Sequence, residues 1–249
     1  MSEIIDQVIA HRSIRKYLSK PIPDDMLHRI LQAGICASNT GNMQVYSMIV
    51  TKDESLRKQL WEVHFKQNMV LQAPVHITFC ADVNRFSKWC RARKAQPGYD
   101  NMLWFCNAAI DATLASQNVA LGAEALGLGI CFLGTAIYNA ARIIDILKLP
   151  KGVIPVTALV MGYPDEQPPP AGRLPFEAVV HKETYHDYTA EEINSLYADL
   201  EASEQTRQLV EMNQMETLAQ VFTEKRYAKK DNEAFSKAYL EVLKGQGFL

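Results

Sequence analysis

The stretch "NMLWFCNAAIDATLASQNVALGAEALGLGICFLG", residues 101–134, decides the fold of this chain. Residues 101–126 predict one long helix, which would span about 39 Å at 1.5 Å per residue. Small side chains recur along it and permit close packing against another helix: Ala108, Ala109, Ala112 and Ala115. Gly127 and Gly129 are expected to end the helix, and the apolar run 130–134 predicts a strand. A long central helix that leads into a strand is typical of an α+β domain.

Shorter elements surround this helix. Apolar residues spaced by three and four predict helices over 3–9, from Pro23 and Asp24 to about residue 35, over 53–67 and over 139–148. Apolar runs rich in β-branched residues predict strands over 45–51, 75–81 and 153–163. Four strands mixed with helices give an α+β fold, for which we expect a mixed central sheet flanked by helices.

The C-terminal part of the chain differs in composition. The stretch "PDEQPPPAGRLPFE", residues 164–177, is a proline-rich loop that can form neither helix nor sheet ladder. From Ala190 onward the chain is helical and more charged, with no obvious core of its own. We therefore expect a main domain over 1–189, and over 190–249 a helical extension that packs on this domain or on a partner subunit.

The composition restricts the class of protein. The chain has 249 residues, of which 48% are hydrophobic and 22% charged, as in ordinary globular proteins. A formal net charge of −2 gives no general attraction to nucleic acid or to an anionic membrane. The first residues are acidic where a signal peptide is basic, and the five cysteines contain no C-x-x-C motif. We expect a cytoplasmic protein with reduced core thiols, without a nucleic-acid or membrane partner.

Several catalytic and nucleotide-binding motifs are missing. The segment "GAEALGLG", residues 122–129, follows a helix, whereas a dinucleotide-binding fingerprint follows a strand. The sequence has no P-loop, no G-x-S-x-G and no H-E-x-x-H. His181 and His186 lie in a polar segment without a third ligand, so we expect no metal site.

Five polar segments remain as candidates for a site. The stretch "HRSIR" holds His11, Arg12, Ser13 and Arg15; guanidinium and hydroxyl groups suit a phosphate, although a solvated turn is the alternative. In "SNTGNMQ" the amides of Asn39, Asn42 and Gln44 can bind the edge of a heterocycle, and a helix-stopping loop fits these residues equally well. The remaining segments offer Gln67 at a helix end, "FLGT" at 132–135, where glycine permits close approach of a flat ligand, and Arg173 in the proline-rich loop.

The ordered set "HRSIRKY", "ASNTGNMQ", "FCADVNRF", "LGLGICFLGT", "MGYP" and "GRLP" resembles the flavin-dependent nitroreductase and flavin reductase family. The resemblance covers about residues 3–185 and is greatest to the longer-chain branch of oxygen-insensitive nitroreductases and NADPH–flavin oxidoreductases. It implies an FMN oxidoreductase, built as a domain-entwined homodimer, that takes hydride from NADPH or NADH. The implied acceptor is a small molecule: a nitroaromatic, a quinone or free flavin.

The resemblance also implies roles for single residues. His11, Arg12, Ser13 and Arg173 would hold the phosphate and ribityl end of FMN, and Arg15 would reach the flavin pyrimidine and stabilise the reduced ring electrostatically. Asn39 would come from the other subunit, and the residues beside the ring would be Gln67, Phe132, Leu133, Gly134 and Thr135. Two departures are Ala171, where close relatives carry lysine, and Thr135, which replaces a second glycine.

The preference between NADPH and NADH depends on a further cationic site. The candidates are Arg207, Arg226 with Lys229 and Lys230, and the basic run 84–94, for each of which a solvated surface is the alternative. Together they favour NADPH. Two other functions stay open: a flavin-binding protein without turnover, and a flavoenzyme of the same fold with another chemistry, such as dehalogenation, flavin breakdown or peptide-azoline oxidation.

Overall fold

The computed structural model describes residues 3–249 and divides into two compact units. The first unit comprises the chain up to Pro169 together with Ser236–Leu249, and the second comprises Pro170–Phe235. The predicted extension is therefore divided, because its last residues belong to the first unit. The predicted functional division into a main domain over 1–189 and an extension over 190–249 stays a prediction.

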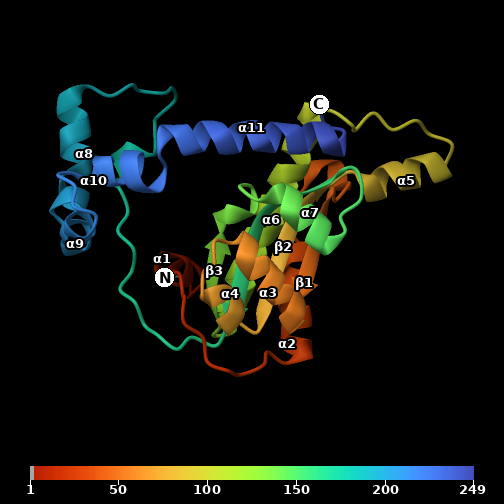
Figure 1. Cartoon of the computed structure of the whole chain (residues 1–249), viewed down its shortest axis with the longest axis horizontal. Coiled ribbons are helices and arrows are strands. Elements are labelled where there is room, and N and C mark those ends of the chain that lie inside the picture. The colour runs from red at the N-terminus through yellow and green to blue at the C-terminus, as the bar shows by residue number, and fades with distance from the viewer. Residues whose placement is uncertain (1–2) are drawn as a thin grey trace. The chain divides into compact units, whose positions relative to one another are not determined.

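The first unit is built on a four-stranded sheet in the order β1-β2-β4-β3 (Figure 1). The strands are β1 (Tyr46–Thr51), β2 (Val75–Asp82), β3 (Gly129–Leu133) and β4 (Val153–Gly162). All three neighbouring pairs are antiparallel. In place of the mixed sheet that the sequence suggested, parallel pairing occurs in one isolated bridge, between Ser13 and Ile130. The α+β class is confirmed.

Helices cover both faces of this sheet, so that every residue of β2 is buried. In the first unit they are α1 (Glu3–Ile9), α2 (Asp24–Ile35), η1 (Thr40–Asn42), α3 (Glu54–Val63), α4 (Met69–Gln72), α5 (Asn84–Ala92), α6 (Met102–Ala125), η2 (Gly134–Ala136) and α7 (Ala140–Leu147). Helix α5 falls within the basic run 84–94, for which no helix was predicted from the sequence. The predicted end of α3 at residue 67 was wrong. The helix ends at Val63, because the backbone of Phe65 and Lys66 is left-handed.

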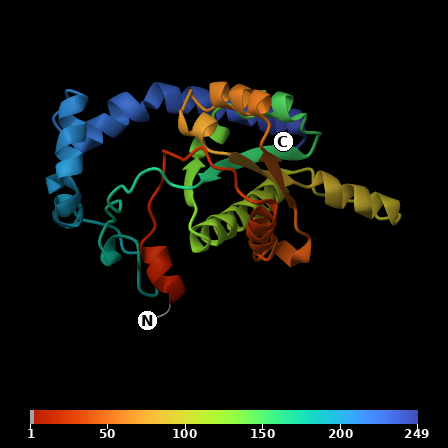
Figure 2. The ribbon, with the colours of Figure 1, turned by 90° about the horizontal axis from the view of Figure 1, so that it is seen from below.

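The predicted long helix, α6, is confirmed and lies against α2 on one face of the sheet. Asn101 caps its first turn by accepting a hydrogen bond from the Trp104 amide at 3.2 Å. A Cβ on Gly34 of α2 would lie 2.5 Å from Val119 Cγ2, so the two helices approach closely only because this residue is glycine. The opposite face is packed by α3, α4 and α7, which Figure 2 shows across the sheet from α6.

The second unit consists mainly of helices: α8 (Ala190–Ala202), α9 (Glu204–Met212), α10 (Leu218–Gln220), η4 (Val221–Arg226) and η3 (Phe176–Ala178). Thr189 and Glu192 form a capping box at the start of α8, a helix without a buried residue. Helix α11 (Lys229–Gln246) begins in this unit and ends in the first. There Leu243 and Phe248 pack with Phe105 of α6, which anchors the C-terminal residues in the main core.

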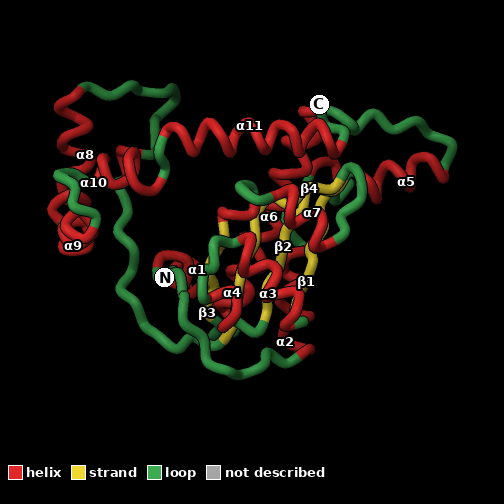
Figure 3. The backbone as a smooth tube through the Cα atoms, in the orientation of Figure 1, coloured by secondary structure: helices red, strands yellow, loops and turns green. Residues whose placement is uncertain are grey.

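Residues 165–175, which follow β4, form a loop without helix or strand (Figure 3). This agrees with the proline-rich composition of the segment. Among residues 3–249, no helix is long and apolar enough to cross a membrane.

Candidate functional site

The segment "HRSIRKY", residues 11–17, forms a strap along the free edge of β3. Ser13 pairs with Ile130 in the parallel bridge, and the Ile14 amide donates to the Ile130 carbonyl at 2.8 Å. Ile14 and Tyr17 are buried, and the Tyr17 hydroxyl donates to the Ile14 carbonyl at 2.6 Å. The two apolar side chains fix the strap, which leaves the polar residues between them turned away from the core.

Gly129 allows the strap to lie this close. A Cβ at this position would stand 2.6–2.9 Å from three side-chain atoms of Ile14, which is closer than real Cβ contacts. The prediction that Gly129 ends the long helix was wrong, because this residue is the first residue of β3. Gly127, with a φ of +78°, is the residue that follows the helix in the left-handed conformation.

The backbone of the strap is also held from the side of the loop after β4. One carboxylate oxygen of Glu166 accepts hydrogen bonds from the amides of Arg15 at 2.5 Å and Lys16 at 3.1 Å. The Arg15 residue itself is exposed. Its backbone is therefore anchored, while its guanidinium is available to a ligand.

A cleft of about 580 Å³ opens beside the start of the strap. His11 and Arg12 contribute to its wall, and each already has a protein partner: His11 Nδ1 lies 2.6 Å from Glu124 Oε1, and Arg12 Nη1 donates to the Pro168 carbonyl at 3.1 Å. These contacts leave Arg12 with further N–H groups for an anion. The predicted cluster of His11, Arg12, Ser13 and Arg15 thus lies together along one strand edge.

Cys131 lies beneath this cluster as a buried thiol. Burial raises its pKa, and the Arg15 guanidinium and a hydrogen bond with Ser13 act in the opposite direction with smaller effect. The thiol therefore stays protonated at neutral pH and is a poor nucleophile. Its electrostatic contact with Arg15 shows that the strap and the middle of β3 are neighbours.

The predicted ring segment, Phe132–Thr135, runs from the end of β3 into η2. Leu133 is buried, whereas Gly134 is exposed, and a Cβ on Gly134 would meet nothing within 4 Å. The packing of the chain does not itself require this glycine. The open backbone fits the close approach of a flat ring, as FMN would need.

Gln67 is linked to this segment by His64, a residue that was not among the candidates predicted from the sequence. The Gln67 side-chain amide donates to the His64 carbonyl at 3.0 Å, and His64 Nδ1 lies 2.7 Å from the Thr135 hydroxyl oxygen. His64 follows α3 directly as its C-terminal cap. Gln67 lies in the turn before α4 and not, as predicted, at a helix end. The two segments expected to contact the ring are thus joined by one buried residue, through the backbone carbonyl of His64 on the Gln67 side and its imidazole on the Thr135 side.

The loop of Asn39, Asn42 and Gln44 lies apart from this cluster. The Asn39 side chain accepts from the Gln44 amide at 3.1 Å, the Gln44 side chain donates to Asn42, and the loop backbone is tied to α6 by Asp111, which accepts from the Thr40 amide at 2.8 Å. Arg85 of the basic run 84–94 donates to the Gln44 carbonyl, so it is a structural contact of this loop.

The sheet register measures this separation. Thr51 of β1 and Cys131 of β3 belong to one row across the four strands, which makes the two edges about 14 Å apart. Tyr46, where β1 begins after the loop, is five residues further along, or about 17 Å. The loop and the strap therefore lie at diagonally opposite corners of the sheet, roughly 20 Å apart.

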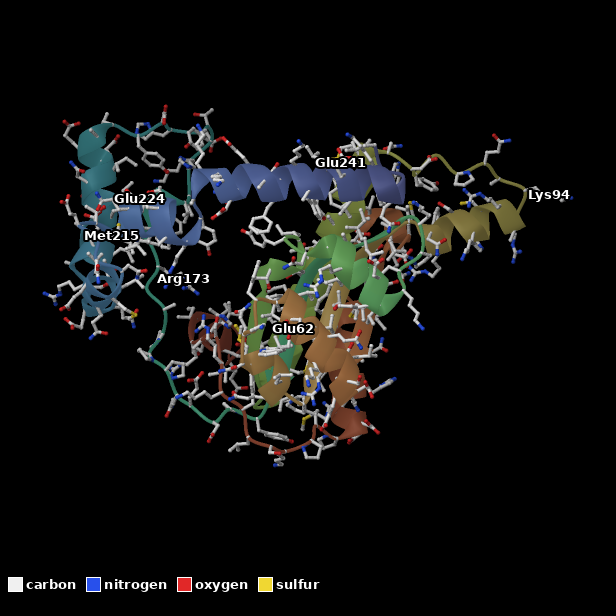
Figure 4. All side chains as sticks on the ribbon, in the orientation of Figure 1. Glu62, Lys94, Arg173, Met215, Glu224 and Glu241 are labelled. Carbon is white, nitrogen blue, oxygen red and sulfur yellow. The ribbon has the colours of Figure 1, made fainter. Side chains whose placement is uncertain are left out.

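The remaining candidates belong to the second unit. Arg173, labelled in Figure 4, is exposed and donates to the carbonyls of Ala171 and Gly172 in its own segment. Arg207 forms an exposed ion pair with Glu204 at 3.0 Å. Arg226 is exposed at the end of η4. The roles proposed for these arginines stay predictions.

Comparison with known proteins identifies the family. A sequence model described as "Nitroreductase family" matches residues 8–163. One relative is the protein named "FMN reductase [NAD(P)H]" of Bacillus subtilis (strain 168). It is 35% identical over 190 residues, which cover 74% of this chain and 75% of the relative. The oxygen-insensitive NADPH nitroreductase of Salmonella typhimurium is 35% identical over 185 residues, with the same shares of 74% and 75%.

Solved structures agree with these sequence matches. A Bacteroides fragilis protein described as an oxidoreductase is 50% identical, with a TM-score of 0.97 over 98% of this chain and 99% of that chain. The NADPH:FMN oxidoreductase of Vibrio harveyi, complexed with NAD⁺, is 28% identical, with a TM-score of 0.81 over 97% of this chain and 98% of that chain. By the family match over residues 8–163 and by these relatives, the chain belongs to the nitroreductase family.

Proposed function

We propose that this chain is an FMN-dependent oxidoreductase that transfers hydride from NADPH or NADH to a small acceptor. The observation that carries the proposal is the strap: it aligns two arginines and a serine along the edge of β3, whose end is open at Gly134. Relatives named FMN reductase and NADPH-flavin oxidoreductase support it. Arg12, Ser13 and the open backbone at Gly134 would hold FMN, which would supply the hydride chemistry between the nicotinamide and a nitroaromatic, a quinone or free flavin.

Arg12 and Ser13 suit the phosphate end of FMN. Arg12 is oriented by its hydrogen bond to the Pro168 carbonyl and keeps free guanidinium N–H groups. His11 is paired with Glu124 at 2.6 Å and would act as a wall of the cleft. Arg173 stays a candidate second cation for the phosphate of FMN. Ala171 occupies the position at which the resemblance leads us to expect a lysine.

Arg15 has a different proposed task. Hydride transfer adds negative charge to the flavin ring, and a fixed cation stabilises that charge as it develops. Arg15 qualifies because Glu166 holds its backbone amide at 2.5 Å while its side chain is exposed. It therefore acts on the rate of flavin reduction more than on retention of the cofactor.

We propose a homodimer in which the loop of Asn39, Asn42 and Gln44 reaches the flavin of the partner subunit. The diagonal separation of loop and strap within one chain supports this. Apolar side chains of the first unit are also left uncovered: on α1 Ile4 is 71% and Ile9 74% exposed, and on α6 Leu103 is 67% exposed. Exposed apolar faces of this kind mark subunit interfaces.

Arg207 and Arg226 are proposed to bind the extra phosphate of NADPH. The ion pair of Arg207 with Glu204 is exposed and therefore weak enough to exchange for a phosphate. Five free cysteines, of which three are buried, support a location in the reducing cytoplasm.

The absorption spectrum of the purified protein tests the function. We expect a yellow protein whose flavin band bleaches when NADPH or NADH is added without oxygen and returns with a nitroaromatic or quinone. Flavin released by heat should run as FMN on chromatography, since the strap offers cations for one phosphate. A yellow protein that neither nucleotide bleaches would establish a flavin-binding protein without turnover, and released FAD would contradict the proposed cofactor.

A further inference from the structure

Two buried histidines lie behind the ring segment, and neither has yet been given a role toward a ligand. His64 and His76 are both 0% exposed, and their Nε2 atoms are 3.3 Å apart. The other nitrogen of His64 lies 2.7 Å from the Thr135 hydroxyl oxygen. Thr135, His64 and His76 thus form a hydrogen-bonded row that leads from the start of β2 to the end of the ring segment.

The position of the protons in this row can be assigned. Two Nε2 atoms at hydrogen-bond distance require that one donates and the other accepts, so at least one of the imidazoles is neutral. Burial lowers the pKa of His64 to about 4 and that of His76 well below its usual range, which makes both rings neutral at pH 7. Each ring therefore carries one N–H.

His76 Nδ1 decides which of the two rings donates. This atom is buried and has no hydrogen-bond partner among residues 3–249. An orphaned N–H costs more than a bare acceptor nitrogen, so the proton of His76 belongs on Nε2. His76 then donates to His64 Nε2, and His64 donates from Nδ1 to the Thr135 oxygen.

This assignment leaves the Thr135 hydroxyl hydrogen free. The oxygen already accepts from His64, and no protein acceptor for its hydrogen occurs among the hydrogen bonds of residues 3–249. Thr135 is half-buried, next to the exposed Gly134. The fixed acceptor direction restricts rotation of the hydroxyl, so its hydrogen points away from the histidines.

We infer that Thr135 donates its hydroxyl hydrogen to the polar edge of bound FMN, and that His64 and His76 are positioning residues that hold this donor in place. The inference rests on the proposed function, which puts FMN beside Phe132–Thr135. It gives a reason for threonine where the resemblance leads us to expect glycine. The backbone carbonyl of His64 also accepts from the Gln67 side chain at 3.0 Å, so a single residue contacts both Gln67 and the segment Phe132–Thr135.

Two variants of Thr135 test the donor. Thr135→Val keeps the shape and removes the hydroxyl, Thr135→Ser keeps the hydroxyl, and Thr184→Val, at an exposed position, controls for the substitution itself. A donor at the ring edge favours the electron-rich reduced flavin. Thr135→Val should therefore weaken binding of reduced FMN about tenfold and of oxidised FMN less than threefold, which lowers the midpoint potential by about 15–30 mV. Thr135→Ser should restore the potential.

The positioning role of His64 has its own readouts. Histidine labelled with ¹⁵N should show, in the protein without flavin, a neutral His64 protonated at Nδ1 and a neutral His76 protonated at Nε2. His64→Asn, whose amide nitrogen replaces Nδ1, should retain the wild-type potential, whereas His64→Leu should match Thr135→Val. If His64→Leu does not fold, the Thr135 pair and the tautomers decide the question.

The failure of the inference differs from the failure of the proposed function. An unchanged potential in folded Thr135→Val, or a His64 protonated at Nε2, overturns the inference while the wild-type enzyme still reduces FMN. Wild-type protein that binds no FMN overturns the proposed function, and with it the role of Thr135, even if the tautomers are as assigned.

Discussion

The buried histidine pair makes the stability of the fold depend on pH above the range in which carboxylates titrate. The folded pKa of His64 is about 4, below the value of 6.5 for the unfolded chain. Since the unfolded state binds more protons below pH 6.5, the free energy of unfolding falls as the pH decreases from 6.5 towards 4.

The size of the effect follows from this difference. Between pH 7.5 and 5.0, His64 alone is expected to reduce the free energy of unfolding by about 2 kcal/mol. His76, which is fully buried and also faces the cation of Arg57, should contribute a similar amount. At pH 5.0 aspartates and glutamates are still ionised in the unfolded chain, so the histidines dominate this interval.

Urea unfolding followed by circular dichroism at five pH values between 7.5 and 5.0 measures this slope. His64→Asn should roughly halve it, because only His76 would remain. His28→Asn, a change of an exposed residue on α2, should retain the wild-type slope. A free energy of unfolding that stays constant between pH 7.5 and 5.0 would show that the buried pair is not neutral in the folded protein.

Three further predictions concern the strap and the nucleotide. Gly129→Ala should push the strap from β3, lower the free energy of unfolding by about 1–3 kcal/mol and weaken FMN binding in fluorescence titrations, whereas Gly98→Ala, with open space around it, should do neither. In stopped-flow reduction, Arg15→Ala should slow the reaction more than it weakens FMN binding, and Arg12→Ala should do the reverse; equal loss of flavin at unchanged rates would contradict the assigned roles. NADPH should exceed NADH at least about tenfold in kcat/KM at low salt, since a charge-assisted contact contributes ~1.5–3 kcal/mol, and equal values would argue against a phosphate site.

Elements with strong local signals could be predicted from the sequence. Helix α6 was expected over 101–126 and spans Met102–Ala125, because Asn101 caps one end and Gly127 follows the other. The strap and the ring segment were also proposed from the sequence, because cations around a serine and a glycine at a strand end each have a local chemical reason, and their roles stay predictions.

The remaining features depend on contacts between distant residues. Helix α3 ends at Val63 although neither Phe65 nor Lys66 is a typical left-handed residue. The contacts of His64 with Thr135 and Gln67 lie at this point. His76 lies in a strand that was predicted from its apolar residues, and nothing in one sequence links this histidine to a residue of another element. For the same reason Gly129 was taken for a helix stop, since its contact with Ile14 exists only in the folded chain.

The diagonal placement of strap and loop has a consequence for mixed populations of subunits. In the proposed homodimer, each flavin takes its strap from one chain and its loop from the other, so it needs only one intact copy of each. When a strap-defective variant, such as Arg12→Ala, is unfolded and refolded with a loop-defective variant, about half of the pairs should be mixed, and each mixed pair should contain one complete site. Two preparations that are inactive alone would then complement each other, to about a quarter of the wild-type activity.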